Sequence, residues 1–294
     1  MVRINRYQVM QVSKPLISKY FKQLKEKIYT PEDIQKIFNS NREEWRLLRS
    51  TKIGDFIKFI IENKLVKEIA IQMPNNTAKK RYIQEKVSIY KVALSIDTNT
   101  FLSHYTALYL HNLTDNIIKD IYTNKELTKK TVRVNKLIQE NIDRAFSRPM
   151  RVSRQAASSG EYRIFLLNSK NFEKLGVIDF KKDGEVIYLT NIERTLIDAA
   201  VRPNYSGGVT EVLNAFKKAK GKFSVNKLKA MLKKMDYIYP YHQIIGFYLE
   251  KAGYEERLIK LFEDFEIKYN FYLTYRMKQK DFNDRWKLFF PKEF

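Results

Sequence analysis

Apolar residues recur at intervals of three and four through most of the first 63 residues, which is the spacing of one face of an α-helix. Thr30 as an N-cap, with Pro31 at the first helical position, marks the start of a helix. Ser50 and Thr51 are expected to cap another, after a short extra turn over 42–48. The pattern therefore predicts three helices, over residues 14–28, 31–38 and 52–63.

Residues 65–89 have the composition of β-strands. Two runs of β-favouring residues, 65–73 and 79–89, flank the turn signal Pro74-Asn75-Asn76-Thr77. Three helices followed by a hairpin is the order of a winged helix-turn-helix. The sequence therefore predicts such a DNA-binding domain over residues 1–95.

The remaining residues, 96–294, change from strands to helices along the chain. A helix is expected first, over 97–112, and Asp183-Gly184 is expected to join two strands in a hairpin. Short strands are expected over 117–122, 150–152, 162–167, 175–180 and 185–189. Helices are expected over 191–201, 209–220, 224–234, 240–253 and 255–264. This order predicts an α+β second domain with a mixed β-sheet, on which the aromatic tail 268–294 docks.

The charge of the chain points to an anionic partner. Its 294 residues include 55 Lys and Arg against 33 Asp and Glu, a net charge of +22. Residues 1–95 hold 20 Lys and Arg against nine Asp and Glu, a surplus of 11. Such a balance favours nucleic acid. The alternative is an ordinary solvated surface, because Lys and Arg dominate any exposed face.

In a helix-turn-helix the second helix of the motif enters the major groove, while flanking cations hold phosphates. We expect Thr51, Lys52 and Asp55 at the reading end of the third helix, with Lys58 on its exposed side. The other residues expected to contact DNA precede that helix or lie at the tip of the wing: Arg42, Arg46, Arg49, Lys79, Lys80 and Arg81. The connection over 39–50 is longer than usual, so which helix reads DNA stays open.

The helix predicted at 191–201 carries a polar row beside its apolar side. Thr190 is expected to cap it, with Glu193 reciprocating in a capping box. The polar row consists of residues spaced four apart, namely Arg194, Asp198 and Arg202. Such a row is compatible with an intrahelical ion pair, a phosphate-binding catalytic group, or a site for a protein partner. In the last case Arg194, Asp198, Arg202 and Tyr205 make the contacts, with Arg202 and Tyr205 presented outward.

Several kinds of chemistry lack their residues in this sequence. There is no cysteine and no glycine-rich phosphate loop. His104, His111 and Asp115 share a helical face, but we interpret both histidines as structural and expect no metal and no cofactor. No nucleophile stands beside a general base, so we expect no enzyme. The start lacks a signal peptide and no apolar run could span a membrane, so we expect a cytoplasmic protein.

Two runs of residues carry a resemblance to a known family. The run from Asn191 to Gly208 resembles the Glu-Arg-Thr-Leu-x-Asp…Arg-Pro…Gly-Gly core of the AbiEi antitoxins. The run from Ser103 to Thr114 resembles the Ser-His-x-Ser-Ala-Ala…His-Gly-Leu helix of that family, with Asn112 where the family usually has glycine. AbiEi proteins belong to abortive-infection toxin–antitoxin systems that act in phage defence. They are encoded beside a nucleotidyltransferase toxin and repress their own operon.

The resemblance implies a division of labour along this chain. Residues 1–95 would be a winged helix that binds inverted repeats in promoter DNA, as dimers or paired monomers. Residues 96–294 would be an antitoxin domain that counters the cognate nucleotidyltransferase toxin, by direct contact or indirectly. Two alternatives stay open. The protein could be a toxin-binding module without specific DNA function, or an enzyme that transfers phosphate through Arg194, Asp198 and Arg202.

Overall fold

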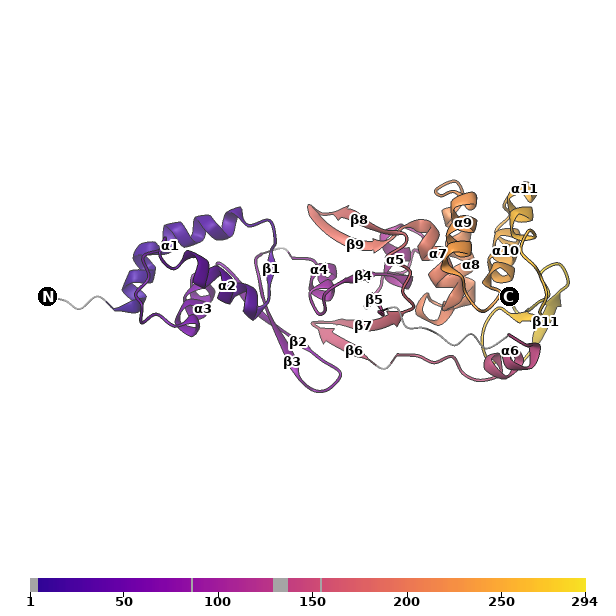
Figure 1. The fold of residues 1–294 in the computed structure, drawn as a ribbon, viewed down its shortest axis with the longest axis horizontal. Helices are drawn as coiled ribbons and strands as arrows, with labels where there is room; N and C mark the ends of the chain where they lie inside the picture. The colour runs from indigo at the N-terminus through magenta and orange to yellow at the C-terminus, as the bar shows by residue number, and fades with distance from the viewer. Residues whose placement is uncertain (1–4, 86, 129–136, 154) are drawn as a thin grey trace. The chain divides into compact units, whose positions relative to one another are not determined.

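The structure is a computed structural model that describes residues 5–85, 87–128, 137–153 and 155–294. Its backbone, drawn in Figure 1, divides into two units of mixed helix and strand. Unit 1 comprises Met1–Thr98 together with Ala157–Glu161. Unit 2 comprises Asn99–Ala156 and Tyr162–Phe294. Among the described residues, no helix is long and apolar enough to cross a bilayer.

Unit 1 contains a group of helices and a small antiparallel sheet. The helices are α1 (Arg6–Gln23), α2 (Pro31–Asn41), α3 (Ile53–Glu62) and α4 (Ile89–Leu94). The strands are β1 (Ile28–Tyr29), β2 (Lys67–Gln72), β3 (Ala78–Ile83) and, except for its first residue, β6 (Ala156–Ser159). β3 pairs with both β1 and β2, and Gln72 at the end of β2 pairs with Ser158 of β6. The predicted order of three helices and a hairpin is therefore present.

The core of unit 1 is built around Trp45, which lies in the connection between α2 and α3 and is completely buried. Its ring stacks on Phe56 of α3 with centroids 5.4 Å apart, and Tyr20 of α1 meets it edge-on at 5.5 Å. The Ser13 hydroxyl of α1 donates a hydrogen bond of 2.6 Å to the Trp45 carbonyl. The connection between α2 and α3 is long because it supplies this core residue.

The first helix differs from its prediction. It begins at Arg6, because Asn5 and Gln8 form a capping box. It ends at Gln23, where Leu24 takes an extended conformation. The predicted end, Ile28, belongs instead to β1. Local periodicity could not reveal this end, because the pairing of β1 with β3 is a long-range contact.

Two further boundaries in unit 1 are corrected. The N-cap of α3 is Lys52, whose backbone N–H donates to the Asp55 carboxylate at 3.0 Å; neither Ser50 nor Thr51 caps it. The second hairpin strand ends at Ile83 and does not extend to residue 89. Ser88 then caps α4, a helix that the pattern did not predict. By contrast Thr30 caps α2 as predicted, with Asp33 completing the capping box.

Unit 2 contains a five-stranded run of mixed sheet in the order β7-β5-β4-β9-β8. Its strands are β4 (Thr100–Leu102), β5 (Asp120–Glu126), β7 (Tyr162–Ser169), β8 (Val177–Lys182) and β9 (Glu185–Thr190). β5 pairs parallel with β7, and β4 pairs parallel with β9. The β8–β9 hairpin turns at Asp183 and Gly184, both with positive φ, as the Asp-Gly signal predicted.

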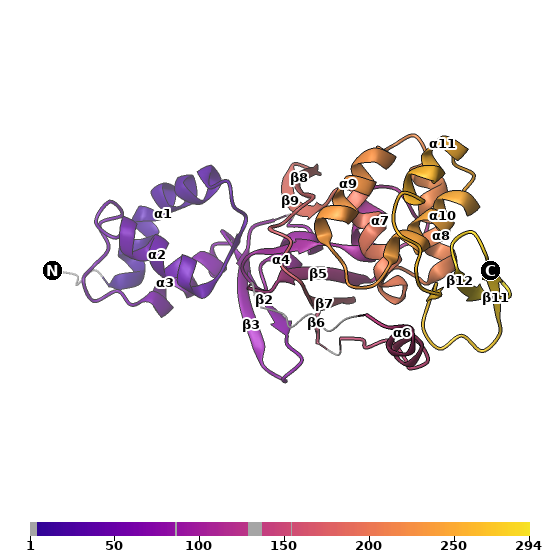
Figure 2. The same ribbon diagram turned by 45° about the vertical axis from the view of Figure 1, so that its right-hand side comes forward.

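The helices of unit 2 are α5 (His104–Leu110), α6 (Gln139–Phe146), α7 (Ile192–Val201), α8 (Val209–Ala219), α9 (Val225–Met235), α10 (Tyr241–Lys251) and α11 (Glu256–Ile259). All of them except α6 gather beside one another in the views of Figures 1 and 2. Short 3₁₀ turns, η1 (Pro203–Tyr205) and η2 (Lys260–Phe262), follow α7 and α11. Contacts with α5, α8, α9 and α10 surround α7, so it is buried along most of its length. The five helices predicted beyond residue 190 are all present, the last as α11 and η2.

The aromatic tail docks on unit 2, as predicted, and folds into a small sheet of its own. Its strands are β10 (Phe271–Tyr272), β11 (Lys280–Asn283) and β12 (Leu288–Pro291). Trp286 is completely buried against Gly246 of α10. A Cβ added at Gly246 would lie 2.3 Å from the indole ring, so only glycine fits beneath it. Arg285 anchors the same turn through Glu263, at 2.7 Å, and Glu256, at 2.5 Å.

Four predictions for unit 2 are wrong. Residues 97–112 are not one helix, because β4 joins the sheet before α5 begins. The strand predicted at 117–122 begins at Asp120, and Ile117 is exposed. Residues 150–152 are not a strand, and the next N–H, of Ser153, donates to the Tyr205 hydroxyl. The cap of α7 is Asn191, whose side chain accepts from the Arg194 N–H at 2.9 Å; Thr190 is not the cap.

Candidate nucleic-acid interface

Three of the predicted DNA-binding cations lie at the N-cap of α3 or in the segment that precedes it. Arg46, Arg49 and Lys52 are exposed, and none forms an ion pair with another described residue. Arg46 lies at a positive φ of 52°, in the turn that follows the buried Trp45. Lys58 is also exposed, three-quarters of its side chain being accessible, and it lies 3.8 Å from Glu62 one turn along. The start of α3 and the segment before it therefore expose a surplus of cations, although Glu43 and Glu44 are exposed in the same segment.

Arg42 shapes this surface from within. Its guanidinium donates to the carbonyl of Leu48 at 2.6 Å, to that of Thr51 at 3.1 Å, and to that of Arg49. The same group lies 5.2 Å from the centre of the Phe38 ring. Because these carbonyls belong to the segment that leads into α3, Arg42 holds the exposed cations in place.

Of the residues predicted to read DNA, one is buried and another forms an ion pair within the chain. Thr51 is buried, with only 2% of its surface exposed. Asp55 forms an ion pair with Arg6 at 2.8 Å. Arg6 is 49 residues away in sequence, and no local signal connects it to α3. Its guanidinium offsets the negative charge that Asp55 would otherwise present to a phosphate.

The three cations predicted at the wing tip lie on a strand instead. The tip is the uncharged turn from Met73 to Thr77, while Lys79, Lys80 and Arg81 belong to β3. Arg81 is buried and donates to the Ser95 carbonyl at 2.5 Å, and burial lowers the pKa of its guanidinium. Lys79 donates to the Ile96 carbonyl at 2.8 Å, and Lys80 forms an ion pair with Glu68 at 2.9 Å. Arg81 therefore serves the fold of unit 1.

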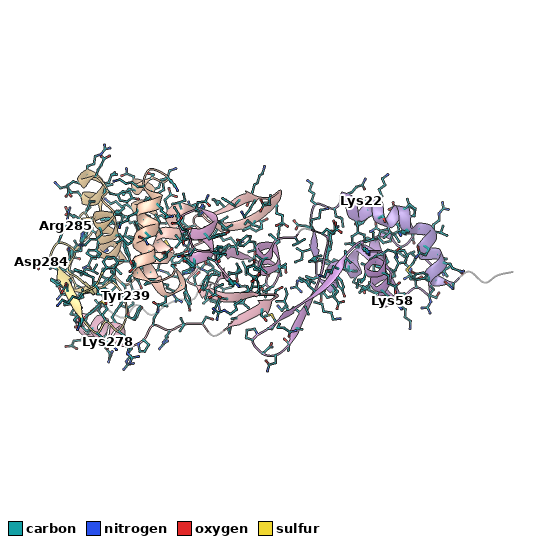
Figure 3. All side chains as sticks on the ribbon, turned by 180° about the vertical axis from the view of Figure 1, so that it is seen from behind. Lys22, Lys58, Tyr239, Lys278, Asp284 and Arg285 are labelled. Carbon is teal, nitrogen blue, oxygen red and sulfur yellow. The ribbon has the colours of Figure 1, made fainter. Side chains whose placement is uncertain are left out.

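Other exposed cations lie on α1, which has no acidic residue. They are Lys14, Lys19 and Lys22. In Figure 3, Lys22 and Lys58 lie on different sides of unit 1, so its positive charge is not confined to α3. An exposed lysine on a helix looks alike in sequence whether or not it binds a partner, so the pattern did not single out these three.

The polar row of α7 lies in the interior of unit 2. Arg194 is completely buried, and its Nε donates to Asp198 at 2.9 Å. One Nη donates to the Leu175 carbonyl at 2.8 Å and lies 3.7 Å from the Glu126 carboxylate. Burial disfavours the charged form of Arg194 and the Asp198 carboxylate favours it, with a net rise in pKa. The guanidinium thus joins α7 to β5 and to the loop before β8.

The expectation that Tyr205 is presented outward is wrong. Tyr205 is 3% exposed, and its hydroxyl accepts a hydrogen bond of 2.6 Å from the Ser153 N–H. Arg202 is exposed, with its guanidinium carbon 5.9 Å from the centre of the Tyr205 ring. Of the four residues proposed to contact a partner, only Arg202 is open to solvent, because other elements of unit 2 cover α7 on most sides.

His104, the first residue of α5, and His111, its C-cap, each form a hydrogen bond inside unit 2. His104, at a φ of 51°, accepts or donates a bond of 2.8 Å with the Ser103 hydroxyl, and burial lowers its pKa to about 4. His111 donates through Nε2 to the Thr190 carbonyl at 2.7 Å. Asp115 instead forms an ion pair with Lys218. The described residues include no group of three His, Cys, Asp or Glu side chains that could hold a metal ion.

Comparison with known proteins identifies a fold but no family. No family model matches the chain, and no curated protein matches it. Among solved structures, the chain is similar to the RV2827C protein from Mycobacterium tuberculosis, with a TM-score of 0.60. That similarity covers 98% of this chain and 92% of the other, at 12% sequence identity. At this identity the likeness concerns the fold alone.

Proposed function

We propose that the protein is a cytoplasmic antitoxin and transcriptional repressor. Unit 1 acts as a winged helix-turn-helix that binds promoter DNA, and unit 2 counters a nucleotidyltransferase toxin encoded nearby. The resemblance of residues 103–114 and 191–208 to the AbiEi family supports the biological role. The observation that carries the DNA-binding role is that Arg46 and Arg49 before α3 and Lys52 at its N-cap are exposed and form no ion pair with another described residue.

The geometry of unit 1 suits contact with a duplex. Lys52 is the N-cap of α3, and Arg46 and Arg49 precede it, so we assign α3 as the reading helix. Arg46 and Arg49 lie in the segment before it, where a DNA backbone passes in helix-turn-helix complexes. Arg42 orders that segment, and Arg6 offsets the charge of Asp55. Few bidentate donors reach the first turn, so phosphate contacts supply most of the affinity.

The interior of unit 2 argues for a binding role over catalysis. Arg194 and Asp198, the pair that a phosphate-transferring enzyme would use, are both nearly inaccessible to solvent. A substrate could not reach them without opening the contacts of α7 with its neighbouring helices. We therefore propose that they stabilise the unit, and that its surface meets the partner.

The test is a mobility-shift titration of the full chain with a duplex from its own upstream region. A triple variant, R46Q/R49Q/K52Q, should bind more weakly and reduce the slope of log affinity against log salt by about 2.7, since each phosphate contact contributes about 0.9. The matched control, K227Q/K233Q/K234Q, removes three exposed charges from α9 of unit 2 and should leave the slope nearly unchanged. Equal binding of a scrambled duplex, or equal effects of the two variants, would refute the proposed repressor.

A further inference from the structure

Three segments of unit 2 meet at a surface that carries four arginines. The segment 146–153 is tied to the loop after β10, because the Arg276 N–H donates to the Phe146 carbonyl at 2.7 Å. It is tied to η1 by the bond from Ser153 to the Tyr205 hydroxyl. Arg202 packs over the same Tyr205 ring. We call the residues that these segments bring together, Arg148, Arg151, Arg202 and Arg276, the arginine surface.

The arginine surface is not neutralised by any residue in the described part of the chain. All four residues are exposed, and none forms an ion pair or side-chain hydrogen bond with another residue that the structure describes. The segments that contribute them, 147–153, 202–206 and 273–279, contain no aspartate or glutamate. Four guanidinium groups therefore face solvent without an internal carboxylate, although unit 2 has acids elsewhere.

Aromatic rings form a rigid base beneath this surface. Tyr275 stacks on Phe146 with centroids 4.3 Å apart, and Tyr239 meets Phe146 edge-on at 5.6 Å. In Figure 3 the labels of Tyr239 and Lys278, the latter two residues from Arg276, locate this part of unit 2. Because Tyr205 is buried and Tyr275 is already stacked, the rings offer few free faces on which nucleic-acid bases could stack.

The composition of the surface favours a protein over a nucleic acid. Arginine and tyrosine are enriched in protein interfaces, whereas lysine is depleted. Val152, with 57% of its surface exposed, adds an apolar contact beside Arg151. The three segments expose four arginines and one lysine, Lys278, whereas the exposed cations of α9, Lys227, Lys233 and Lys234, are all lysines. A second copy of this chain is a poor partner, because a net charge of +22 on each copy is repulsive.

We infer that the arginine surface docks an acidic segment of a protein partner, with its forked guanidinium groups binding carboxylates. Planar guanidinium matches carboxylate in a bidentate pair, and an aromatic base limits the side-chain freedom that binding must remove. The inference deepens the role proposed for unit 2 and rests on it for the identity of the partner. It replaces Arg194, Asp198 and Tyr205, which are buried, by residues that a partner can reach.

The test measures binding of a fluorescein-labelled oligoglutamate peptide to the full chain by fluorescence anisotropy. The variant R148Q/R151Q/R276Q should weaken binding about tenfold, as expected for the loss of several exposed pairs. The control K227Q/K233Q/K234Q removes the same charge from α9 and should change affinity less than about twofold. A third variant, R148K/R151K/R276K, keeps the charge but loses the fork, and should bind with intermediate affinity.

The outcomes separate this inference from the proposed repressor. Equal losses in the glutamine variant and the α9 control would overturn it, because binding would then follow net charge alone. Full affinity in the lysine variant would overturn the forked contact with carboxylates. A loss of duplex DNA or RNA binding, with peptide binding intact, would assign the surface to nucleic acid instead. All of these variants retain Arg46, Arg49 and Lys52, so the DNA-binding role of unit 1 is tested separately by the substitutions at those three residues.

Discussion

The helices α3 and α7 have the same length, and both carry charged residues beside an apolar stripe, yet their surroundings are opposite. α3 turns Lys52 and Lys58 to solvent and buries only one side. α7 is covered by neighbouring elements, and its charged residues Arg194 and Asp198 lie in the interior. A row of polar residues on a helix therefore lies either on a solvent-exposed surface or in a buried hydrogen-bonded network. How many other elements pack against the helix decides between the two.

Because Arg194 of α7 is buried and Arg49 before α3 is exposed, their replacement should affect the free energy of unfolding very differently. Replacing Arg194 by alanine leaves the carboxylates of Asp198 and Glu126 buried without their cation. We expect a loss of about 3–5 kcal/mol in the free energy of unfolding, measured by urea denaturation. Arg49→Ala on the exposed surface before α3 is the matched control and should change stability by no more than about 0.5 kcal/mol. Similar effects at both positions would show that the interior of α7 is hydrated and the contrast false.

The two units should also differ in their response to acid, because all three histidines belong to unit 2. Burial lowers the pKa of His104 to about 4, and that of His242 to about 4, from an ordinary value of 6.5. A histidine with a depressed pKa takes up its proton more readily when unfolded. The free energy of unfolding is therefore highest above pH 6.5, where the histidine is neutral in both states, and it decreases as the pH falls from 6.5 towards 4. For His104 the loss between pH 6.5 and 5 is about 2 kcal/mol.

Hydrogen exchange at pH 7 and pH 5 measures this difference unit by unit. Amides of unit 2 should lose protection at pH 5, while those of α1, α2 and α3 should not follow the same profile. The variant His104→Asn retains a side chain that tolerates positive φ, so it should reduce the pH dependence for unit 2 and leave the part due to His242. Equal loss of protection in both units would contradict the assignment to these histidines.

Local signals predicted some features of the two units and not others. The capping box at Thr30, the Asp-Gly hairpin and the helices beyond residue 190 depend on neighbouring residues, so periodicity and turn chemistry reveal them. Long-range contacts decided what failed. β4 joins the sheet through β5 and β9, Arg6 reaches Asp55 across 49 residues, and the neighbours of α7 bury its polar row.

The candidate site shows the same limit. The sequence could predict that cations gather around α3, because their number and spacing are local. It could not predict that Arg42 and Arg81 turn inward to bind carbonyls, since those acceptors are provided by the folded backbone. Nor could it predict the arginine surface, because segments more than fifty residues apart contribute to it.

Substitutions at Gly54 should have the smallest effect on stability, and they test directly whether the exposed face of α3 contacts DNA. Gly54 lies in the first turn of α3, is exposed, and a Cβ added there meets no atom within 4 Å. Packing therefore does not require glycine, and Gly54→Ala should stabilise the chain by about 0.5–1 kcal/mol through lower backbone entropy in the unfolded state. If α3 reads DNA, the lack of a side chain at Gly54 allows the helix backbone to approach the base edges closely. Gly54→Gln should then weaken binding to the upstream duplex while leaving thermal stability unimpaired. Unchanged DNA affinity in the glutamine variant would mean that another face of unit 1 meets the duplex, and α3 would then be exposed without being the reading helix.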